Sequence, residues 1–194
     1  MARSLSLEFV VSVPDVGLLP PTHAEVAFLG RSNVGKSSVL NALAGGKKLA
    51  PVSRTPGRTR ELVCFGLAGS GATVVDCPGY GYAKVAKTTR AAWLPMLEAY
   101  LLEREGLAMV MLLIDGEVGP TESDLGMLDW LRAHARPHTV IATKQDKVRP
   151  TQLDARQREL AAACLLDRSD VVWVSATHNR GIAALRELVR TWLA

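Results

Sequence analysis

The fold of this chain is decided by the stretch Gly30-Arg31-Ser32-Asn33-Val34-Gly35-Lys36-Ser37, which fits the pattern G-x-x-x-x-G-K-[ST] of phosphate-binding loops. An apolar run at 24–29 predicts a strand before it, and residues 36–44 predict a helix after it. The glycines let backbone N–H groups point inward at phosphate oxygens, and the helix adds its positive dipole end. The sequence therefore predicts a nucleoside triphosphate site, with Lys36 between the β- and γ-phosphates and the Ser37 hydroxyl on Mg²⁺.

Strand-like and helix-like runs alternate along the rest of the chain. The predicted strands are 24–29, 61–67, 72–76, 108–115, 138–143 and 170–175, and the predicted helices are 36–44, 90–104, 121–135, 151–165 and 181–193. Pro95 predicts a later start or a bend of the second helix. Such alternation is typical of an α/β three-layer sandwich with a mostly parallel sheet, whose ligands bind at the carboxyl ends of the strands.

The N-terminal segment has the period of a strand. The apolar residues that alternate there are Leu5, Leu7, Phe9, Val11 and Val13. We predict an N-terminal strand or arm over 1–23 and a nucleotide-binding domain over 24–194. The alternation fits either an edge strand or an arm that contacts a partner, and the sequence does not choose between them.

The composition of the 194 residues, 48% hydrophobic and 22% charged, is that of a globular protein with one sizeable core. The longest apolar run, 107–114, is too short to span a membrane, and the start of the chain lacks a signal-peptide pattern. Three scattered cysteines argue against a disulfide framework or a zinc site and indicate a reducing compartment. We expect a monomeric, cytoplasmic protein with no membrane association.

Two further segments predict magnesium and γ-phosphate contacts. The run 72–75 is followed by Asp76-Cys77-Pro78-Gly79. An acidic residue that ends a buried strand beside a phosphate loop can hold the hydration shell of Mg²⁺, and the Gly79 N–H could meet the γ-phosphate. Thr59, in Pro56-Gly57-Arg58-Thr59-Arg60, could complete the Mg²⁺ coordination when a γ-phosphate is present. Taken alone, the first motif is equally well explained by a strand-ending turn, and the second is better explained by a solvated loop.

The last two motifs predict recognition of guanine. Thr143-Lys144-Gln145-Asp146 follows the run 139–142. The Asp146 carboxylate accepts from two donors on the guanine edge, a pair that adenine does not offer, and the Lys144 stem can lie along the base. Val174-Ser175-Ala176 ends another strand, and its Ala176 N–H could donate to guanine O6. Each motif alone also fits an ordinary polar loop. Since all five elements occur in order beside predicted strands, together they predict a guanine-nucleotide-binding domain.

At this point the chain resembles the EngB (YihA/YsxC) group of the TrmE–Era–EngA–EngB–septin-like GTPases. The matching segments are the phosphate loop with Ser38, Thr55-Pro56-Gly57-Arg58-Thr59, Asp76-Cys77-Pro78-Gly79-Tyr80-Gly81-Tyr82-Ala83, Trp93, Tyr100-Leu101, the run from Pro120 to Leu131, and Thr143-Lys144-Gln145-Asp146-Lys147. The resemblance covers nearly the whole chain. The chain departs from the group at Gly116, where an arginine is usual, and at Cys77, where leucine is more common.

The resemblance implies a P-loop GTPase (Ras-like) fold with a six-stranded, mostly parallel sheet, one antiparallel strand and helices on both faces. It implies GTP and GDP as ligands, Mg²⁺ as cofactor, and a role in assembly of the large ribosomal subunit and in normal cell division and septation. The predicted nucleotide-binding residues are Gly30, Arg31, Ser32, Asn33, Val34, Gly35, Lys36, Ser37, Ser38, Gly57, Arg58, Thr59, Arg60, Glu61, Asp76, Cys77, Pro78, Gly79, Thr143, Lys144, Gln145, Asp146, Val174, Ser175 and Ala176. The predicted magnesium ligands are Ser37, Thr59 and Asp76, and catalytic roles fall to Lys36, Thr59 and Asn33.

Slow hydrolysis is expected because Tyr80 stands where many GTPases carry a water-positioning glutamine. The sequence nominates no arginine finger either, since Arg58 and Arg60 are candidates only by proximity, and a missing finger can be worth about 10³–10⁵ in rate. In related GTPases an asparagine at the position of Asn33 helps to hold K⁺ where the finger would lie. Asn33 could equally cap its own turn.

Positive charge is concentrated at 45–90, which has a net charge of +6 within a chain of net charge +4. This segment could contact RNA phosphates, or its charges could merely offset bound nucleotide. Two functions therefore stay open. One is a GTP-hydrolysing switch that binds precursors of the large ribosomal subunit or their RNA. The other is a nucleotide-stabilised binding module in which hydrolysis is incidental.

Overall fold

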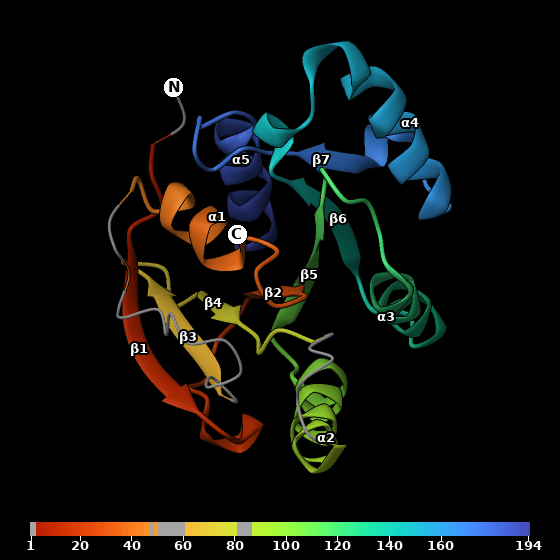
Figure 1. Ribbon diagram of the computed structural model, residues 1–194. Coiled ribbons are helices and arrows are strands. Elements are labelled where there is room, and N and C mark those ends of the chain that lie inside the picture. Colours follow the sequence, from red (N-terminus) through yellow and green to blue (C-terminus); the bar gives the residue numbers. More distant parts are fainter. Residues whose placement is uncertain (1–2, 47–48, 50–60, 81–86) are drawn as a thin grey trace.

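A computed structural model describes residues 3–46, 49, 61–80 and 87–194 (Figure 1). The strands are β1 (Leu7–Val13), β2 (Glu25–Gly30), β3 (Leu62–Leu67), β4 (Thr73–Asp76), β5 (Leu107–Asp115), β6 (His138–Thr143) and β7 (Val171–Trp173). The α-helices are α1 (Lys36–Leu43), α2 (Lys87–Glu103), α3 (Glu122–Ala133), α4 (Leu153–Ala163) and α5 (Ile182–Trp192). None of the helices in these ranges is both long and apolar enough to cross a bilayer.

The strands form one seven-stranded sheet in the order β1-β3-β4-β2-β5-β6-β7. Only β3 runs against its neighbours, β1 and β4, and every other pair is parallel. The prediction of one antiparallel strand in a mostly parallel sheet is thus confirmed, but the predicted count of six strands is wrong by one. The additional strand is β1, which pairs with β3 from Leu7↔Leu67 to Val13↔Leu62 with a bulge after Phe9. The N-terminal alternation is therefore an edge strand, while the division at residue 23 stays a prediction.

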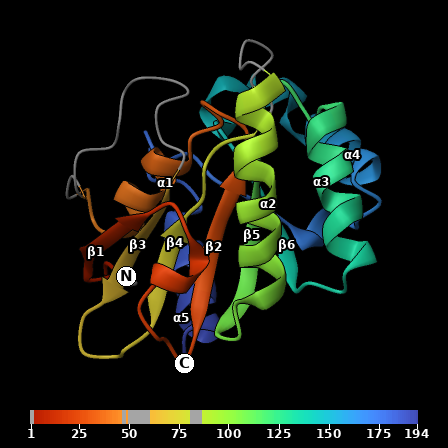
Figure 2. The ribbon, with the colours of Figure 1, turned by 90° about the horizontal axis from the view of Figure 1, so that it is seen from below.

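Helices cover both faces of the sheet, which confirms the three-layer architecture. Figure 2 shows α2 and α3 on one side of the strands and α1 and α5 on the other. Along β2, Ala27 and Leu29 join the core under α2, α3 and α4, whereas Val26 and Phe28 join the core under α1 and α5. All four side chains are fully buried, as expected for a central parallel strand covered on both faces.

The helix α2 begins at Lys87, a little before the predicted start at residue 90. A later start at Pro95 is therefore ruled out, because the helix runs from Lys87 through Pro95 to Glu103. A proline inside a helix removes one backbone hydrogen bond and crowds the preceding turn. Leu97, Tyr100 and Leu101 are each at most 1% exposed, so burial of this face outweighs the local cost.

A buried ionic cluster fixes the end of β2 that lies opposite the phosphate loop. The fully buried Glu25 carboxylate accepts hydrogen bonds from the Thr73 hydroxyl (2.6 Å), the Tyr100 hydroxyl (2.9 Å) and the Arg104 guanidinium (3.0 Å). Arg104 also donates to the Pro20 carbonyl at 2.6 Å. Because every partner of Glu25 is supplied by neighbouring elements, the start of the strand is tied to both β4 and α2.

Candidate functional site

The carboxyl ends of five parallel strands meet at one edge of the sheet and bring the predicted motifs together. β2 ends at Gly30, β4 at Asp76, β5 at Asp115 and β6 at Thr143, and Ser175 lies just beyond β7. The predicted contacts Gly57, Arg58, Thr59 and Arg60 lie outside the described residues. Glu61 is described, and its carboxylate accepts a hydrogen bond from the Ser12 hydroxyl at 2.6 Å.

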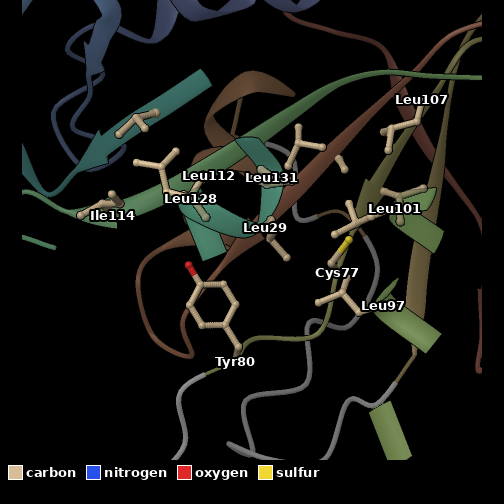
Figure 3. Close-up of a cluster of buried hydrophobic side chains, with 14 of the residues drawn as sticks. Leu29, Cys77, Tyr80, Leu97, Leu101, Leu107, Leu112, Ile114, Leu128 and Leu131 are labelled. Carbon is tan, nitrogen blue, oxygen red and sulfur yellow. The ribbon is translucent and has the colours of Figure 1, made fainter. Parts of the chain in front are cut away.

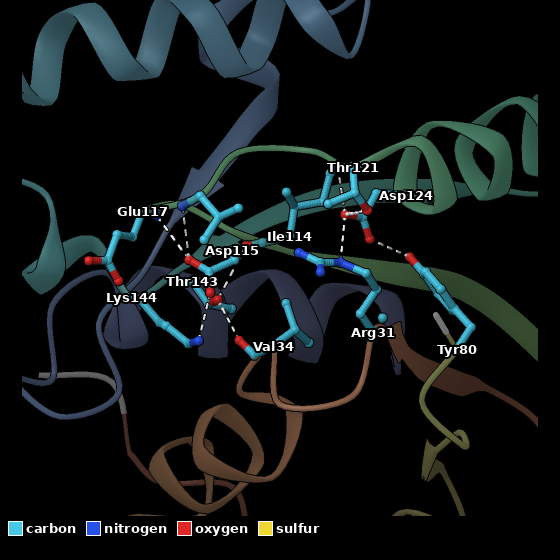
Figure 4. A network of polar contacts seen from close by, with 12 residues as sticks. Arg31, Val34, Tyr80, Ile114, Asp115, Glu117, Thr121, Asp124, Thr143 and Lys144 are labelled. Carbon is cyan, nitrogen blue, oxygen red and sulfur yellow. Dashed lines mark hydrogen bonds and ion pairs between the residues drawn. The ribbon is translucent and has the colours of Figure 1, made fainter. Parts of the chain in front are cut away.

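The phosphate loop is held in place by the adjacent strand ends. The buried Thr143 hydroxyl donates to the Val34 carbonyl at 2.6 Å and also contacts the Ile114 carbonyl at 3.2 Å (Figure 4). Asn33 is exposed and has a φ of 64°, a left-handed conformation that asparagine tolerates better than most residues. The backbone of the loop thus supplies a local reason for Asn33, and the side chain remains open to solvent.

Lys36 and Gly79 lie next to each other at the mouth of the loop. The Lys36 ammonium donates to the Gly30 carbonyl at 3.2 Å. A β-carbon on Gly79 would approach the Ser32 nitrogen to 2.8 Å and the Lys36 ammonium to 3.0 Å, so only glycine fits. A phosphoryl group that contacts Lys36 therefore also comes close to the backbone of Gly79. This spacing suits the γ-phosphate contact predicted for the Gly79 N–H.

Asp76 ends β4 with one carboxylate oxygen that lacks a protein partner. Its Oδ1 is buried and accepts no hydrogen bond from any described residue. Burial raises the pKa of Asp76 to about 6, and the nearby Lys36 ammonium opposes that shift. A shielded carboxylate oxygen beside a phosphate site has the chemistry that Mg²⁺ or its bound water requires. Ser37, in the first turn of α1, is the second described residue that could hold the ion.

The two guanine motifs contact each other directly. The Ser175 hydroxyl donates to the Asp146 carboxylate at 2.6 Å, and the Gln145 N–H donates to the Val174 carbonyl at 3.1 Å. The hydrogen bond from Ser175 lowers the pKa of Asp146, so this carboxylate stays ionised at neutral pH. His178, which the sequence reasoning missed, places Nδ1 at 3.7 Å from the same carboxylate. The Asp146 carboxylate can also accept hydrogen bonds from donor groups on the edge of a base.

Asp115 is a second residue that the sequence reasoning missed. Its carboxylate pairs with the Lys144 ammonium at 2.6 Å and accepts from the backbone N–H groups of Glu117 (3.0 Å) and Val118 (3.3 Å) (Figure 4). The backbone of Lys144 is left-handed, with a φ of 55°, and its side chain reaches toward this carboxylate. The signal was present in the sequence, because Asp115 ends an apolar run in the same way as Asp76 does.

The glycine at position 116 has a steric reason. A β-carbon on Gly116 would lie 2.6 Å from the Thr143 carbonyl oxygen and 2.7 Å from the Trp173 ring. The Gly116 N–H also donates to that same carbonyl at 2.9 Å. Trp173 thus fills the space into which a larger residue would project.

Tyr80 points into the core instead of toward the phosphates. The residue is 4% exposed, and Figure 3 shows its ring beside Leu97 and Leu29. Its hydroxyl donates to the Asp124 carboxylate at 3.0 Å, and burial raises its pKa well above the ordinary value, so it stays a phenol. A side chain held in this way cannot orient water at a γ-phosphate. Its partner Asp124 lies in the run from Pro120 to Leu131 that carries part of the family resemblance.

Comparison with known proteins agrees with this geometry. Residues 25–144 match the model of the family described as 50S ribosome-binding GTPase. The chain is 44% identical over 178 residues to the probable GTP-binding protein EngB of Thermotoga petrophila, across 90% of this chain and 89% of that protein. It is 42% identical over 189 residues to the probable GTP-binding protein EngB of Myxococcus xanthus, across 94% and 92% of the two chains.

Solved structures share the fold. One crystal structure of a probable GTP-binding protein EngB matches with a TM-score of 0.72 and 22% identity, over 88% of this chain and 98% of that one. Era of Aquifex aeolicus bound to GDP and AlF4⁻ matches with a TM-score of 0.69 and 23% identity, over 88% and 56%. The family model and the curated relatives settle membership: the chain belongs to the EngB family of GTP-binding proteins and is a P-loop GTPase that hydrolyses GTP to GDP and phosphate.

Proposed function

We propose that this chain is a slow GTP-operated switch that acts in assembly of the large ribosomal subunit. The observation that supports it most is the shared edge of the sheet, where Lys36, Gly79 and Asp76 form a phosphate and magnesium end and Asp146 with Ser175 forms a base end. The family description names the 50S subunit as the binding partner of its members. The basic segment 45–90 offers charge for contact with RNA phosphates.

Slow turnover follows from the chemistry available at the site. In the proposed site Lys36 and Gly79 meet the γ-phosphate, and Ser37, Asp76 and Thr59 hold Mg²⁺. Tyr80 is buried, and the guanidinium of Arg31, a residue of the phosphate loop, is paired with Asp124 at 2.9 Å. Neither residue is free to stabilise charge that develops in the transition state, a role worth about 10³–10⁵ in rate.

Asn33 is our candidate for a partial substitute, through a K⁺ ion held where an arginine finger would lie. Its side chain is exposed at the mouth of the loop, and its φ of 64° is also compatible with glycine. We expect GTP turnover to be faster in KCl than in NaCl at equal ionic strength. Asn33→Gly keeps the backbone conformation and should lose that difference. Equal rates of the unchanged chain in the two salts would refute the potassium proposal.

The test of the switch is sedimentation with ribosomal particles in the presence of GDP, GTP or a non-hydrolysable GTP analogue. A switch binds large-subunit precursors in the triphosphate state, releases them with GDP, and hydrolyses GTP faster when particles are present. The alternative, a binding module stabilised by nucleotide, predicts binding that does not depend on the nucleotide and no stimulated turnover. Lys36→Ala, which should abolish triphosphate binding, serves as the control for nucleotide dependence.

We further propose a cytoplasmic, monomeric protein whose loss disturbs cell division and septation, as the family resemblance implies. The cytoplasmic part of this proposal is supported by the cysteines, since all three are free and buried, as suits a reducing compartment. Depletion of the protein should cause large-subunit precursors to accumulate before septation fails. Septation defects without precursor accumulation would contradict the order that we propose.

A further inference from the structure

We propose that Asp124 is a positioning residue for the γ-phosphate of GTP, because it holds Gly79 in place through Tyr80 and Arg31. The inference rests on the proposed contact between the γ-phosphate and the Gly79 N–H. It assigns to helix α3 a part in nucleotide discrimination that none of the nucleotide motifs contains.

The Asp124 carboxylate is fully buried and is shared by three elements (Figure 4). Its Oδ2 accepts from Arg31 Nε at 2.9 Å and from the Thr121 N–H and hydroxyl at 2.9 and 2.8 Å. Its Oδ1 accepts from the Tyr80 hydroxyl at 3.0 Å. A buried carboxylate is stable only when donors compensate its charge, so loss of one donor is expected to shift the carboxylate relative to its remaining donors.

Two of these donors immediately flank the phosphate contacts. Arg31 follows Gly30 in the phosphate loop, and Tyr80 follows Gly79. The two segments also meet through their backbones, because the Ser32 N–H donates to the Tyr80 carbonyl at 3.2 Å and Arg31 and Tyr80 form a parallel bridge. Gly79 lies next to these backbone contacts and has no space for a side chain. A shift of Tyr80 therefore moves Gly79 relative to the loop.

Helix capping alone does not account for this arrangement. A capping box at the start of α3 needs only the two reciprocal contacts between Thr121 and Asp124, each from side chain to backbone N–H, and such a cap can lie in solvent. Here the carboxylate is instead buried against Tyr80 and Arg31, which are 44 and 93 residues distant in sequence. The two long-range donors connect the cap to both sides of the γ-phosphate position.

The consequence concerns GTP more than GDP. Only the triphosphate uses the Gly79 N–H, so loosening Gly79 should weaken GTP binding and leave GDP binding nearly unchanged. A hydrogen bond to a charged group has an effect of about tenfold in an equilibrium. General destabilisation of the fold, by contrast, lowers the affinity for both nucleotides together.

The test uses Tyr80→Phe, Asp124→Asn and the double variant of the full chain, with the dissociation constants of GDP and a non-hydrolysable GTP analogue measured for each. We expect each single variant to weaken analogue binding about five- to tenfold, with GDP binding changed less than twofold. The double variant should bind the GTP analogue as tightly as the single variant with the lower affinity, because both changes break the same contact. Tyr80→Phe keeps the buried ring, so it remains informative if Asp124→Asn folds poorly.

Thr121→Val is the matched control, because it removes one donor from the capping side of the same carboxylate. It should lower the melting temperature without changing the ratio of GTP-analogue to GDP affinity. If the unchanged chain bound neither nucleotide, the proposed function and this inference would both be wrong. The inference alone would be wrong in a second case, in which the unchanged chain binds both nucleotides. In that case Tyr80→Phe and Asp124→Asn would keep the same ratio of GTP-analogue to GDP affinity as the unchanged chain, or would lose affinity for both nucleotides equally.

Discussion

At the scale of single residues, the Asp146 carboxylate is the group on which base selectivity depends. It is held by the Ser175 hydroxyl at 2.6 Å and is only 11% exposed, so its geometry is set before a base arrives. Asp146→Asn keeps the size of the side chain and an acceptor for Ser175, but it replaces one acceptor with a donor. The change therefore isolates the recognition of the base.

We expect Asp146→Asn to lower the affinity for GDP tenfold or more, because a hydrogen bond to a charged group contributes about 1.5–3 kcal/mol. Affinity for xanthosine diphosphate should rise, since its edge offers an acceptor to the new amide. Titration with both nucleotides measures the two effects. Asp129→Asn, on an exposed carboxylate of α3, is the control. Unchanged GDP affinity would show that Asp146 does not read the base.

Asp76 gives a prediction for pH. Its pKa rises from 3.8 unfolded to about 6 in the folded chain, so between these values the folded state binds more protons. The free energy of unfolding of the nucleotide-free protein should therefore fall as the pH rises from about 4 to 6, by at most about 3 kcal/mol. Asp76→Asn should remove that slope and be more stable at pH 7, at the expense of Mg²⁺-dependent nucleotide binding. Urea unfolding from pH 4 to 8 without Mg²⁺ measures the slope, and parallel curves for the two chains would contradict it.

At the scale of elements, packing decides where local sequence signals conflict. The periodic apolar positions predicted the five α-helices that the described residues form, because such positions face a sheet that needs cover. The early start of α2 could not be predicted, since Pro95 argues against it locally and the burial of Tyr100 becomes visible only in the folded chain. The role of Asp124 was hidden for the same reason, because its contact with Tyr80 joins distant segments.

The Glu25 cluster gives a prediction for this scale. Glu25→Ala leaves Arg104, whose side chain is 12% exposed, without its carboxylate, and should lower the free energy of unfolding by about 3–5 kcal/mol. Because Glu25 lies at the end of β2 opposite Gly30, GDP affinity measured well below the melting temperature should be unchanged. Chemical denaturation and a GDP titration test both parts. The exposed Glu105→Ala is the control, and a parallel loss of GDP affinity would contradict the separation of the two ends.

At the scale of the whole molecule, β1 closes the sheet beside β3. The sequence predicted its strand character but not its place, because alternation gives the period of a strand and not its neighbour. The sequence motifs at 30–37, 76–79, 143–146 and 174–176 were predicted to lie together because each follows a strand, and the described residues do meet at one edge of the sheet, while their contacts with nucleotide stay a prediction. The motifs did not include Asp115, although it ends an apolar run, and they could not predict His178, whose contact with Asp146 forms only when separate strand ends meet.

Removal of β1 should leave the chain close to unfolding. A shortened chain that starts at residue 14 lacks Leu5, Leu7 and Val13, each at most 6% exposed, and each buried side chain of this kind contributes about 1.5–3 kcal/mol. The total approaches the whole stability of a typical domain. We expect a strongly lowered urea midpoint and association through the open edge of β3. Phe9→Ala, on a side chain that is 49% exposed, should cause a much smaller change. An unchanged midpoint for the shortened chain would refute this role.

The contact between Gly116 and Trp173 constrains how this chain can evolve. An arginine introduced at position 116 alone would meet the Trp173 ring and the Thr143 carbonyl, so that single variant is expected to be destabilised. A smaller residue at position 173 removes part of that obstacle and should make the arginine more tolerable. The two positions lie at the ends of β5 and β7, which flank β6, and residues at them are therefore expected to change together during evolution.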